Sequence, residues 1–141
     1  MNENTLATAV LAASDLERAK RFWHEVFGLE PIMSDDVGGA TYLVGGVPVL
    51  VYESEFAGTN KATALGIMTD DLDRDMAELR AKGVEFIDLD LPGLTTTDGV
   101  AEVDGERAAW FNDTEGNIIS LAQPTSATLA EARERLSAAR G

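Results

Sequence analysis

The sequence predicts an α+β protein that is built from two copies of one strand–helix–strands unit. The main observation is a repeat: residues 14–18 (SDLER) recur 56 positions later as residues 70–74 (DDLDR), and residues 28–32 (GLEPI) recur as residues 83–87 (GVEFI) after a one-residue gap. Each copy also begins with a short apolar run, continues with a helical pattern that ends at a glycine, and is followed by further short apolar runs.

These two copies fill most of the chain and set the expected domain organisation. At 141 residues the chain has the length of one domain. We expect a single domain over residues 1–124, with modules at about residues 5–56 and 60–123. A C-terminal helical extension is expected over residues 125–141.

The first copy opens with a predicted strand over residues 7–13, which is followed by a helix. Ser14 and Glu17 have the spacing of a capping box, in which the Ser hydroxyl and the Glu carboxylate satisfy free N–H groups of the first helical turn. Apolar side chains recur from Leu16 to Phe27 at helical spacing, and Gly28 suits the left-handed residue that closes a helix.

The second copy follows the same order with weaker signals. Residues 62–68 are the expected strand, Asp70 and Asp73 form a weaker cap, and a helix precedes Gly83. The apolar positions of this helix are Leu72, Met76 and Leu79.

The remaining strands form two predicted hairpins. Gly45-Gly46 tolerates the positive φ of a tight turn, and residues 113–117 contain the Gly and Asn that turns favour. The strands that flank these turns are residues 40–44, 47–52, 107–111 and 118–122. Residues 89–106 are expected to be a loop and a candidate rim or lid, because long loops in compact domains are often functional. Thr128 and Glu131 have the spacing of a capping box that begins the C-terminal helix.

Composition excludes several classes of function. The formal net charge of −14 and the pI of about 4.2 disfavour binding to nucleic acid or to anionic membranes. The chain has no cysteine, which excludes disulfides, thiolate nucleophiles and cysteine metal sites. No apolar stretch is long enough to cross a membrane and no signal-peptide pattern is found at the N-terminus, so we expect a cytoplasmic protein.

The chain resembles the glyoxalase/bleomycin-resistance/dioxygenase superfamily, whose members are also called vicinal oxygen chelate proteins. Four segments carry the resemblance: SDLERA at residues 14–19, the aromatic pair at residues 22–23, GLEP at residues 28–31, and AWFNDTEGNIISL at residues 109–121. It covers about residues 5–123 and implies paired βαβββ modules that curl into a mixed-sheet cleft, commonly in a homodimer. Function still has to be argued from the site.

The resemblance also implies a divalent metal, which most enzymes of the family hold with His, Gln or Glu side chains from the first strand of each module and from the last strands. In this chain the corresponding positions are Thr8, Ala64 and Ser120. Two hydroxyls and a methyl group do not supply the converging donors that a divalent ion needs. The single histidine, His24, is expected on the polar flank of the first helix, without a partner for a catalytic triad. We therefore expect no metal and no cofactor.

A cleft with small walls is the site that the sequence predicts. Strand alternation places small residues on the concave face, which leaves room for an organic ligand. Three aromatic residues, Tyr42, Tyr52 and Trp110, are candidates for its wall, although each also suits a plain core position. The predicted ligand-binding residues are Thr8, Tyr42, Tyr52, Ala64, Gly66, Met68, Trp110 and Ser120.

These observations favour a metal-free binding protein, similar to the bleomycin-resistance branch of the superfamily, that sequesters a drug-like or metabolite ligand in the intermodule cleft and forms a homodimer. The alternative is a lyase or isomerase of the same superfamily with an unassigned substrate. A loop carboxylate, such as Asp88, Asp98 or Glu106, would then act as the general base. A third interpretation is a degenerate or structural member of the family. Its function would then lie in the dimer surface, with the C-terminal helix as an interaction element.

Overall fold

The computed structural model of the chain describes residues 2–35 and 38–140, except for the side chain of residue 140. Outside this part lie Met1, Asp36, Val37 and Gly141. The first residue of the predicted domain and the last residue of the predicted C-terminal extension are therefore not described. The chain divides into two compact units. The first runs to Leu65 and includes Asn112–Ile118, and the second comprises Gly66–Phe111 and the residues from Ile119 onward.

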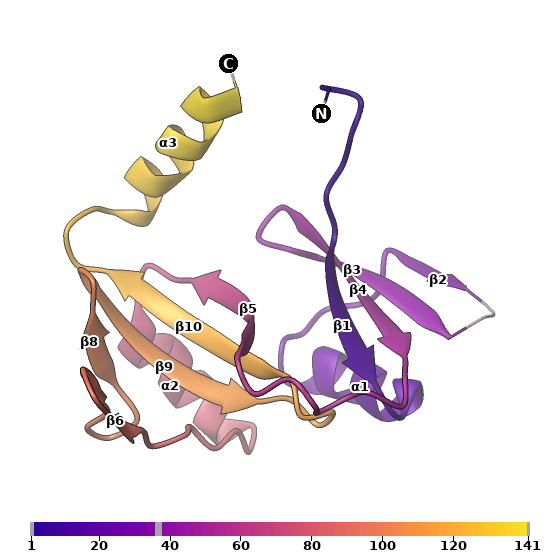
Figure 1. Cartoon of the computed structure of the whole chain (residues 1–141), viewed down its shortest axis with the longest axis horizontal. Helices are drawn as coiled ribbons and strands as arrows, with labels where there is room; N and C mark the ends of the chain where they lie inside the picture. Colours follow the sequence, from indigo (N-terminus) through magenta and orange to yellow (C-terminus); the bar gives the residue numbers. More distant parts are fainter. Residues whose placement is uncertain (1, 36–37, 141) are drawn as a thin grey trace. The chain divides into compact units, whose positions relative to one another are not determined.

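The first unit has the order strand, helix and three strands (Figure 1). Its sheet has the strand order β1-β4-β3-β2, with β1 and β4 parallel and the other neighbours antiparallel. The predicted hairpin is confirmed, because Val44 pairs with Val47 across Gly45 and Gly46, whose φ angles are +55° and +87°. The elements are β1 (Ala9–Ala13), α1 (Leu16–Glu25), β2 (Met33–Asp35), β3 (Gly39–Val44) and β4 (Val47–Glu53).

The second unit repeats this arrangement with the strand order β5-β10-β9-β8. The elements are β5 (Thr63–Met68), α2 (Leu72–Ala81), β8 (Ala101–Val103), β9 (Glu106–Asn112) and β10 (Ile118–Pro124), although the first residues of β5, the last of β9 and the first of β10 are assigned to the first unit. The segment predicted as a plain loop, residues 89–106, instead holds β8 and a small separate hairpin of β6 (Asp90–Leu91) and β7 (Leu94–Thr95). Two copies of one mixed α+β unit confirm the predicted fold class.

The helix starts differ from the predicted capping boxes. Asp15 is the N-cap of α1, because its carboxylate accepts a hydrogen bond from the Arg18 N–H at 3.1 Å. Asp71 takes the same role for α2 and accepts from the Arg74 N–H at 3.0 Å. The predictions for Ser14 and Asp70 were therefore wrong by one residue, since the side chain that caps is the one directly before the first helical residue.

Each helix covers one face of its own sheet. In the first unit Trp23 and Phe22 of α1 are buried against the sheet, whose inward side chains include Leu11, Val49 and Val51. In the second unit Leu72 and Met76 of α2 form a core cluster with sheet residues Ala109 and Leu121, and partly buried apolar side chains, including Ile67 and Phe86, complete it. The face on which each helix packs is thus the apolar one that strand alternation predicts.

The chain ends in a third helix, α3 (Leu129–Arg140). The Thr128 hydroxyl accepts a hydrogen bond from the Glu131 N–H at 3.1 Å, so the predicted capping interaction at this helix is confirmed. Over the described residues, none of the helices is both long and apolar enough to cross a membrane.

Candidate functional site

The sheet face of the first unit that α1 does not cover is apolar and open. Strand register places Val10, Leu50, Thr41 and Met33 in one row across the four strands. Val10 is 54% exposed and Met33 is 64% exposed, whereas Leu11, one residue along β1 from Val10, is 2% exposed. The exposed fractions of Val10 and Leu11 differ because successive side chains project to opposite faces of the pleated strand.

Tyr52 lies in the next row of the same face, since its register partners are Ala12 and Gly39. Its side chain is 41% exposed, so the phenol ring is available to a ligand. Thr8, which the sequence assigns to the same face, is exposed and lies directly before β1.

Tyr42 points the other way. Its ring stacks on Trp23 of α1 with 4.6 Å between centroids, and the residue is 1% exposed. Burial is the main reason that the pKa of Tyr42 is raised. Within residues 2–35 and 38–140, the hydroxyl of Tyr42 and the indole N–H of Trp23 have no hydrogen-bond partner. Tyr42 thus belongs to the packed core under α1, and Tyr52 is the tyrosine of the open face.

In the second unit the face opposite α2 is built from small and flexible side chains. A Cβ atom added at Gly66 would lie 3.2 Å from the Ser120 hydroxyl, which shows that these two residues are immediate neighbours on adjacent strands. Met68, two residues along β5, is 42% exposed. Trp110 is half-buried between the buried residues Ala109 and Phe111, so alternation directs it to the face opposite α2.

The residues present do not fit a divalent metal. Thr8, Ala64 and Ser120, the residues predicted from the sequence to occupy the family's ligand positions, offer two neutral hydroxyls and a methyl group. Within residues 2–35 and 38–140, no group of three or more His, Cys, Asp or Glu side chains could hold an ion. His24 is 66% exposed on α1 and contacts the Glu30 carboxylate. These residues therefore provide no basis for a metal-assisted reaction in this chain.

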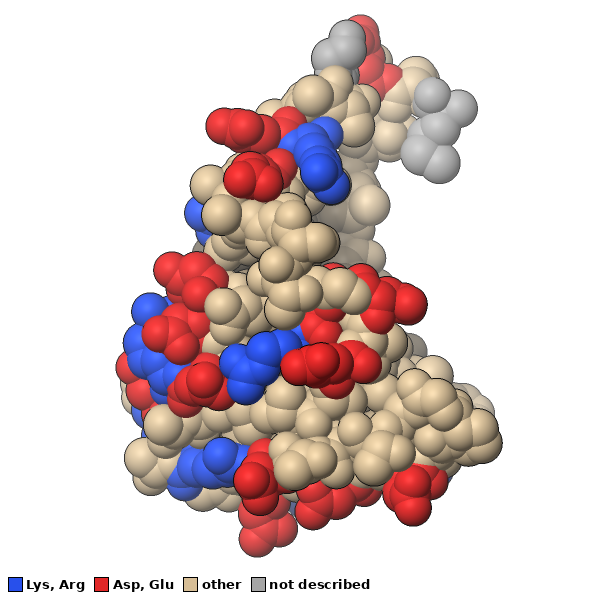
Figure 2. Space-filling model, turned by 90° about the vertical axis from the view of Figure 1, so that its left-hand side faces the viewer, with Lys and Arg blue, Asp and Glu red and all other residues tan. Residues whose placement is uncertain are grey.

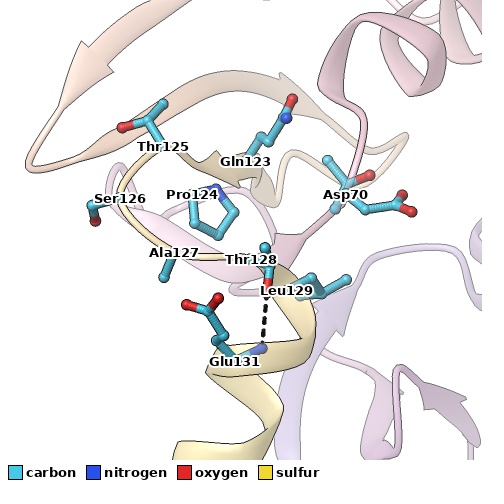
Figure 3. Close-up of a pocket in the computed structure, with 10 residues that line it drawn as sticks. Asp70, Gln123, Pro124, Thr125, Ser126, Ala127, Thr128, Leu129 and Glu131 are labelled. Atoms are coloured by element: carbon cyan, nitrogen blue, oxygen red, sulfur yellow. Dashed lines mark hydrogen bonds between the residues drawn. The ribbon is translucent and has the colours of Figure 1, made fainter.

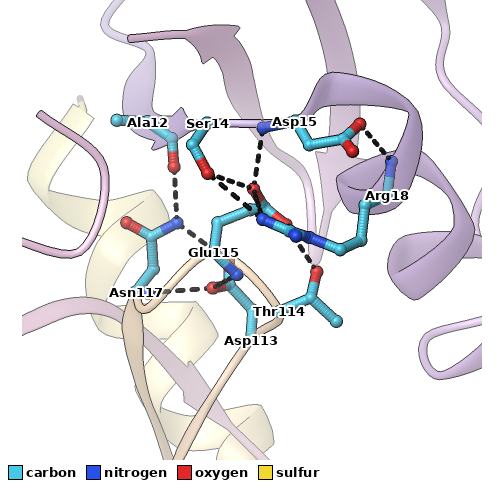
Figure 4. A network of polar contacts seen from close by, with 8 residues as sticks. All are labelled: Ala12, Ser14, Asp15, Arg18, Asp113, Thr114, Glu115 and Asn117. Atoms are coloured by element: carbon cyan, nitrogen blue, oxygen red, sulfur yellow. Dashed lines mark hydrogen bonds and ion pairs between the residues drawn. The ribbon is translucent and has the colours of Figure 1, made fainter. Parts of the chain in front are cut away.

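Sequence reasoning missed a polar network around Glu115 in the first unit (Figure 4). The Glu115 side chain is fully buried, and the Arg18 guanidinium donates to both of its carboxylate oxygens, at 2.7 and 3.0 Å. The Asp15 N–H, the Ser14 hydroxyl and the Thr114 hydroxyl donate to the same carboxylate. Burial by itself would raise the pKa of Glu115, but these hydrogen bonds outweigh it and lower the pKa from 4.5 to about 2.

The rest of the same turn is held by Asp113 and Asn117. The buried Asp113 carboxylate accepts from the N–H groups of Glu115 and Asn117, each at 2.8 Å, and from the Asn117 side-chain amide. That amide also donates to the Ala12 carbonyl at 2.9 Å. Burial raises the pKa of Asp113. The turn between β9 and β10 is thereby fixed onto the start of α1, which explains why residues 112–118 belong to the first unit.

The segment expected to be a rim or lid packs beside α2. The Arg80 guanidinium donates to the Asp98 carbonyl at 3.0 Å and lies over the Phe86 ring, 5.1 Å from its centroid. Gly99 sits so close to Phe86 that an added Cβ would lie 3.1 Å away. Residues 97–100 are thus attached on the helix side of the second unit, and Arg80 lines two open hollows there.

A further pocket of about 490 Å³ lies where β10 gives way to α3 (Figure 3). Residues 124–128 curve around it, and Thr69, Asp70 and Gln123 complete its lining. Two of its hydroxyls hold the fold together, because Thr128 caps α3 and Thr125 donates to the Gly105 carbonyl at 2.7 Å.

Comparison with known families identifies the superfamily to which this chain belongs. Residues 5–121 match the Glyoxalase/Bleomycin resistance protein/Dioxygenase superfamily. The chain belongs to this superfamily. The matched range includes both copies of the repeated unit, so the two sheets with the same strand order are the paired modules of the superfamily. No curated protein is similar enough in sequence to match.

Solved structures of similar fold include fosfomycin resistance proteins. FosX from Listeria monocytogenes has a TM-score of 0.66 and 21% identity, over 95% of this chain and 99% of that chain. FosX from Mesorhizobium loti has a TM-score of 0.60 and 20% identity, over 94% and 98%. UcmS2 has a TM-score of 0.65 and 16% identity, over 86% and 98%. At these identities the likeness shows the fold alone.

Proposed function

We propose that this chain is a metal-free small-molecule-binding protein of the superfamily, which sequesters a drug-like or metabolite ligand on the sheet faces opposite α1 and α2. One observation carries the proposal: each unit leaves one sheet face without a helix, and that face presents exposed apolar side chains beside small ones. Monomeric soluble proteins rarely leave large contiguous apolar surfaces open unless something binds there.

The open faces have the chemistry of an organic-ligand site. In the first unit Tyr52 combines a flat apolar ring with a hydroxyl, and Val10 adds apolar surface beside it. In the second unit the small residues Gly66 and Ser120 share the face opposite α2 with the flexible Met68 side chain and with Trp110. Ala64 completes the small-residue surface of β5. Such surfaces bind by apolar contact, with hydroxyls that orient the ligand.

The absence of suitable donors separates this chain from its structural neighbours. One Listeria FosX crystal contains Mn(II) and sulfate, and another contains Mn(II) and a dihydroxypropylphosphonic acid. At the positions to which the family resemblance assigns metal ligands, this chain has Thr8, Ala64 and Ser120, which lack carboxylate and imidazole groups. We therefore propose binding without metal-assisted chemistry. The family's common homodimer is proposed for this chain as well.

A lyase or isomerase activity would require a general base near the open faces. The carboxylates of Asp88 and Asp98 line the hollow beside Arg80 on the α2 side of the second unit, away from Gly66 and Ser120. This placement favours binding over catalysis, since a base must reach its proton within hydrogen-bond distance.

The proposal is tested by ¹⁹F NMR screening of fluorinated aromatic fragments against the wild type and two variants. Gly66→Leu fills the space above Ser120, so fragments that bind the wild type should lose binding at least tenfold. Ala77→Leu adds the same side chain on the exposed side of α2 and should leave binding unchanged. Ser120→Leu repeats the test from the neighbouring strand if Gly66→Leu fails to fold, as judged by circular dichroism. Fragments that bind all variants equally would refute the site.

A further inference from the structure

The cationic side chains of the chain avoid its strands. Of the eleven Lys and Arg residues, Arg107 in β9 is the only one that lies in the strands that the structure describes. Its guanidinium donates to the Asp73 carboxylate of α2 at 3.0 Å, so Arg107 projects to the face of the second sheet that α2 covers. The described strands therefore give neither open face a cationic side chain.

The cations outside the strands lie in or at the ends of the helices, apart from Lys61. Lys61, in the segment before β5, donates to the Gly58 carbonyl at 3.0 Å. The pKa of Asp70 is lowered mainly by its hydrogen bond with Arg74, and the charge of Arg133 in α3 adds to this effect. On the face of the molecule in Figure 2, Lys and Arg lie among Asp and Glu, and the described residues in this view form no mainly cationic surface.

The open face of the first unit carries a negative charge next to its tyrosine. Asp35 of β2 is the register partner of Gly39, whose other partner is Tyr52. A Cβ atom added at Gly39 would lie 2.8 Å from Asp35 Oδ2 and 3.3 Å from Leu50 Cδ1. The Asp35 carboxylate therefore lies over the backbone of Gly39, on the face that presents Leu50 and Tyr52.

In the second unit the negative charge comes from Glu106, the first residue of β9. Alternation along β9 places Glu106 on the same face as Trp110, because Arg107 and Ala109 face α2. Glu106 is half-buried, and its carboxylate forms no ion pair within the described residues. Partial removal from water strengthens the interaction of a carboxylate with a nearby charge. This face therefore attracts a cation and repels an anion.

These charges decide which ligands the two faces can hold. Proteins hold anions with Arg, Lys or N–H groups that have no other partner, and the described strands supply no cation for this purpose. A protonated amine, in contrast, pairs with carboxylates and is attracted to the faces of Tyr and Trp rings. We infer that the open faces bind an aromatic amine in its protonated form and exclude anionic ligands. The inference rests on the proposed function, because it names the class of ligand for the same faces.

The test compares three probes that share one fluorinated ring and differ in charge. They are para-fluorobenzylamine, which is cationic, para-fluorobenzyl alcohol, which is neutral, and para-fluorobenzoate, which is anionic. Their dissociation constants are measured by ¹⁹F NMR titration at pH 7. We expect the amine to bind at least tenfold more tightly than the benzoate, with the alcohol between them.

Charge variants separate the open faces from the net charge of −14, which favours any cation at long range. Asp35→Asn with Glu106→Gln should lower the ratio of benzoate to amine dissociation constants at least threefold. The matched control, Glu17→Gln with Glu78→Gln, removes two charges from α1 and α2 and should keep the ratio within twofold. If the double variant fails to fold, as judged by circular dichroism, Glu106→Gln alone should lower the ratio at least twofold.

The outcomes distinguish this inference from the proposed function. If none of the three probes binds, the proposed function fails and the inference fails with it. If the probes bind but the benzoate equals or exceeds the amine, the faces bind ligands and only the inference is overturned. It is also overturned if the control lowers the ratio as much as the open-face variant, because the net charge would then explain the preference.

Discussion

The buried carboxylate of Glu115 provides a quantitative prediction. Replacing Glu115 with Gln keeps the size of the side chain, but it leaves one acceptor oxygen in place of two and removes the charge that pairs with Arg18. The shift of the pKa from 4.5 to about 2 corresponds to roughly 3 kcal/mol of stability at neutral pH. Arg18 is 43% exposed, so water screens part of the interaction, and we expect a loss of about 1.5–2 kcal/mol in Glu115→Gln.

The pH dependence follows from the direction of this shift. Because the folded-state pKa of Glu115 is lowered, its contribution is complete above the unfolded-state value of 4.5 and is lost as pH falls towards about 2. The stability difference between wild type and Glu115→Gln should therefore shrink by more than half between pH 6 and pH 3. Other carboxylates titrate in both proteins, so the difference isolates Glu115.

Urea unfolding followed by circular dichroism at pH 6 and pH 3 measures both quantities. Glu17→Gln is the matched control, because this carboxylate is 77% exposed and its ion pair with Lys20 is as long as 3.6 Å. We expect the control to change stability by less than about 0.5 kcal/mol. A difference for Glu115→Gln that is below 0.5 kcal/mol at pH 6, or that is the same at both pH values, would refute the reasoning.

Two further substitutions test the packing of each unit. Gly99→Ala should destabilise the protein by about 1.5–3 kcal/mol, since Gly99 has φ +82° and the added Cβ would press on Phe86 at 3.1 Å. The control Gly93→Ala has a similar φ of +79° but open space around the added Cβ, so it should cost only about 1 kcal/mol. Equal urea midpoints for the two variants would contradict this reasoning. Tyr42→Phe removes a buried hydroxyl without a partner and should leave the melting temperature unchanged or higher, whereas a fall of several degrees would show that the hydroxyl is satisfied.

Much of the fold was predictable because the repeat supplied what local propensity did not. The first strand of each copy is rich in Ala and small residues, which carry little β signal, yet β1 and β5 lie where the repeat placed them. β2 was missed because the exposed residues 33–35 show no alternation. Strands β6 and β7 have two residues each, too short for any periodic pattern.

The candidate site was less predictable than the fold. Alternation correctly separated Leu11 from Val10 and Leu121 from Ser120, because each strand has one helix-covered face. Both tyrosines of the first sheet suit a pocket wall by residue type, but Tyr42 stacks under α1 whereas Tyr52 faces out. The sequence marks Glu115 only as part of a turn, because its partners Arg18 and Ser14 lie about a hundred residues away. Contacts of that range leave no local pattern in a single sequence.

A metal-binding variant provides the positive control for the central claim. Placing His at Thr8 and Ala64 and Glu at Ser120 restores the donor types that the superfamily uses at these positions. If the positions are assigned correctly, this triple variant should retain one Mn(II) per chain after buffer exchange, because imidazole and carboxylate ligands together satisfy such an ion. Failure to retain Mn(II) would count against the assigned positions.

Native mass spectrometry of the purified wild type, before and after incubation with Mn(II), tests the central claim most directly. One spectrum reports the number of chains, any bound metal and any organic ligand that survives purification. The account predicts a mass without stoichiometric metal in both samples, with any additional mass belonging to a small organic ligand. A stoichiometric divalent ion on the wild-type chain would contradict the proposed metal-free site and place metal-assisted catalysis first.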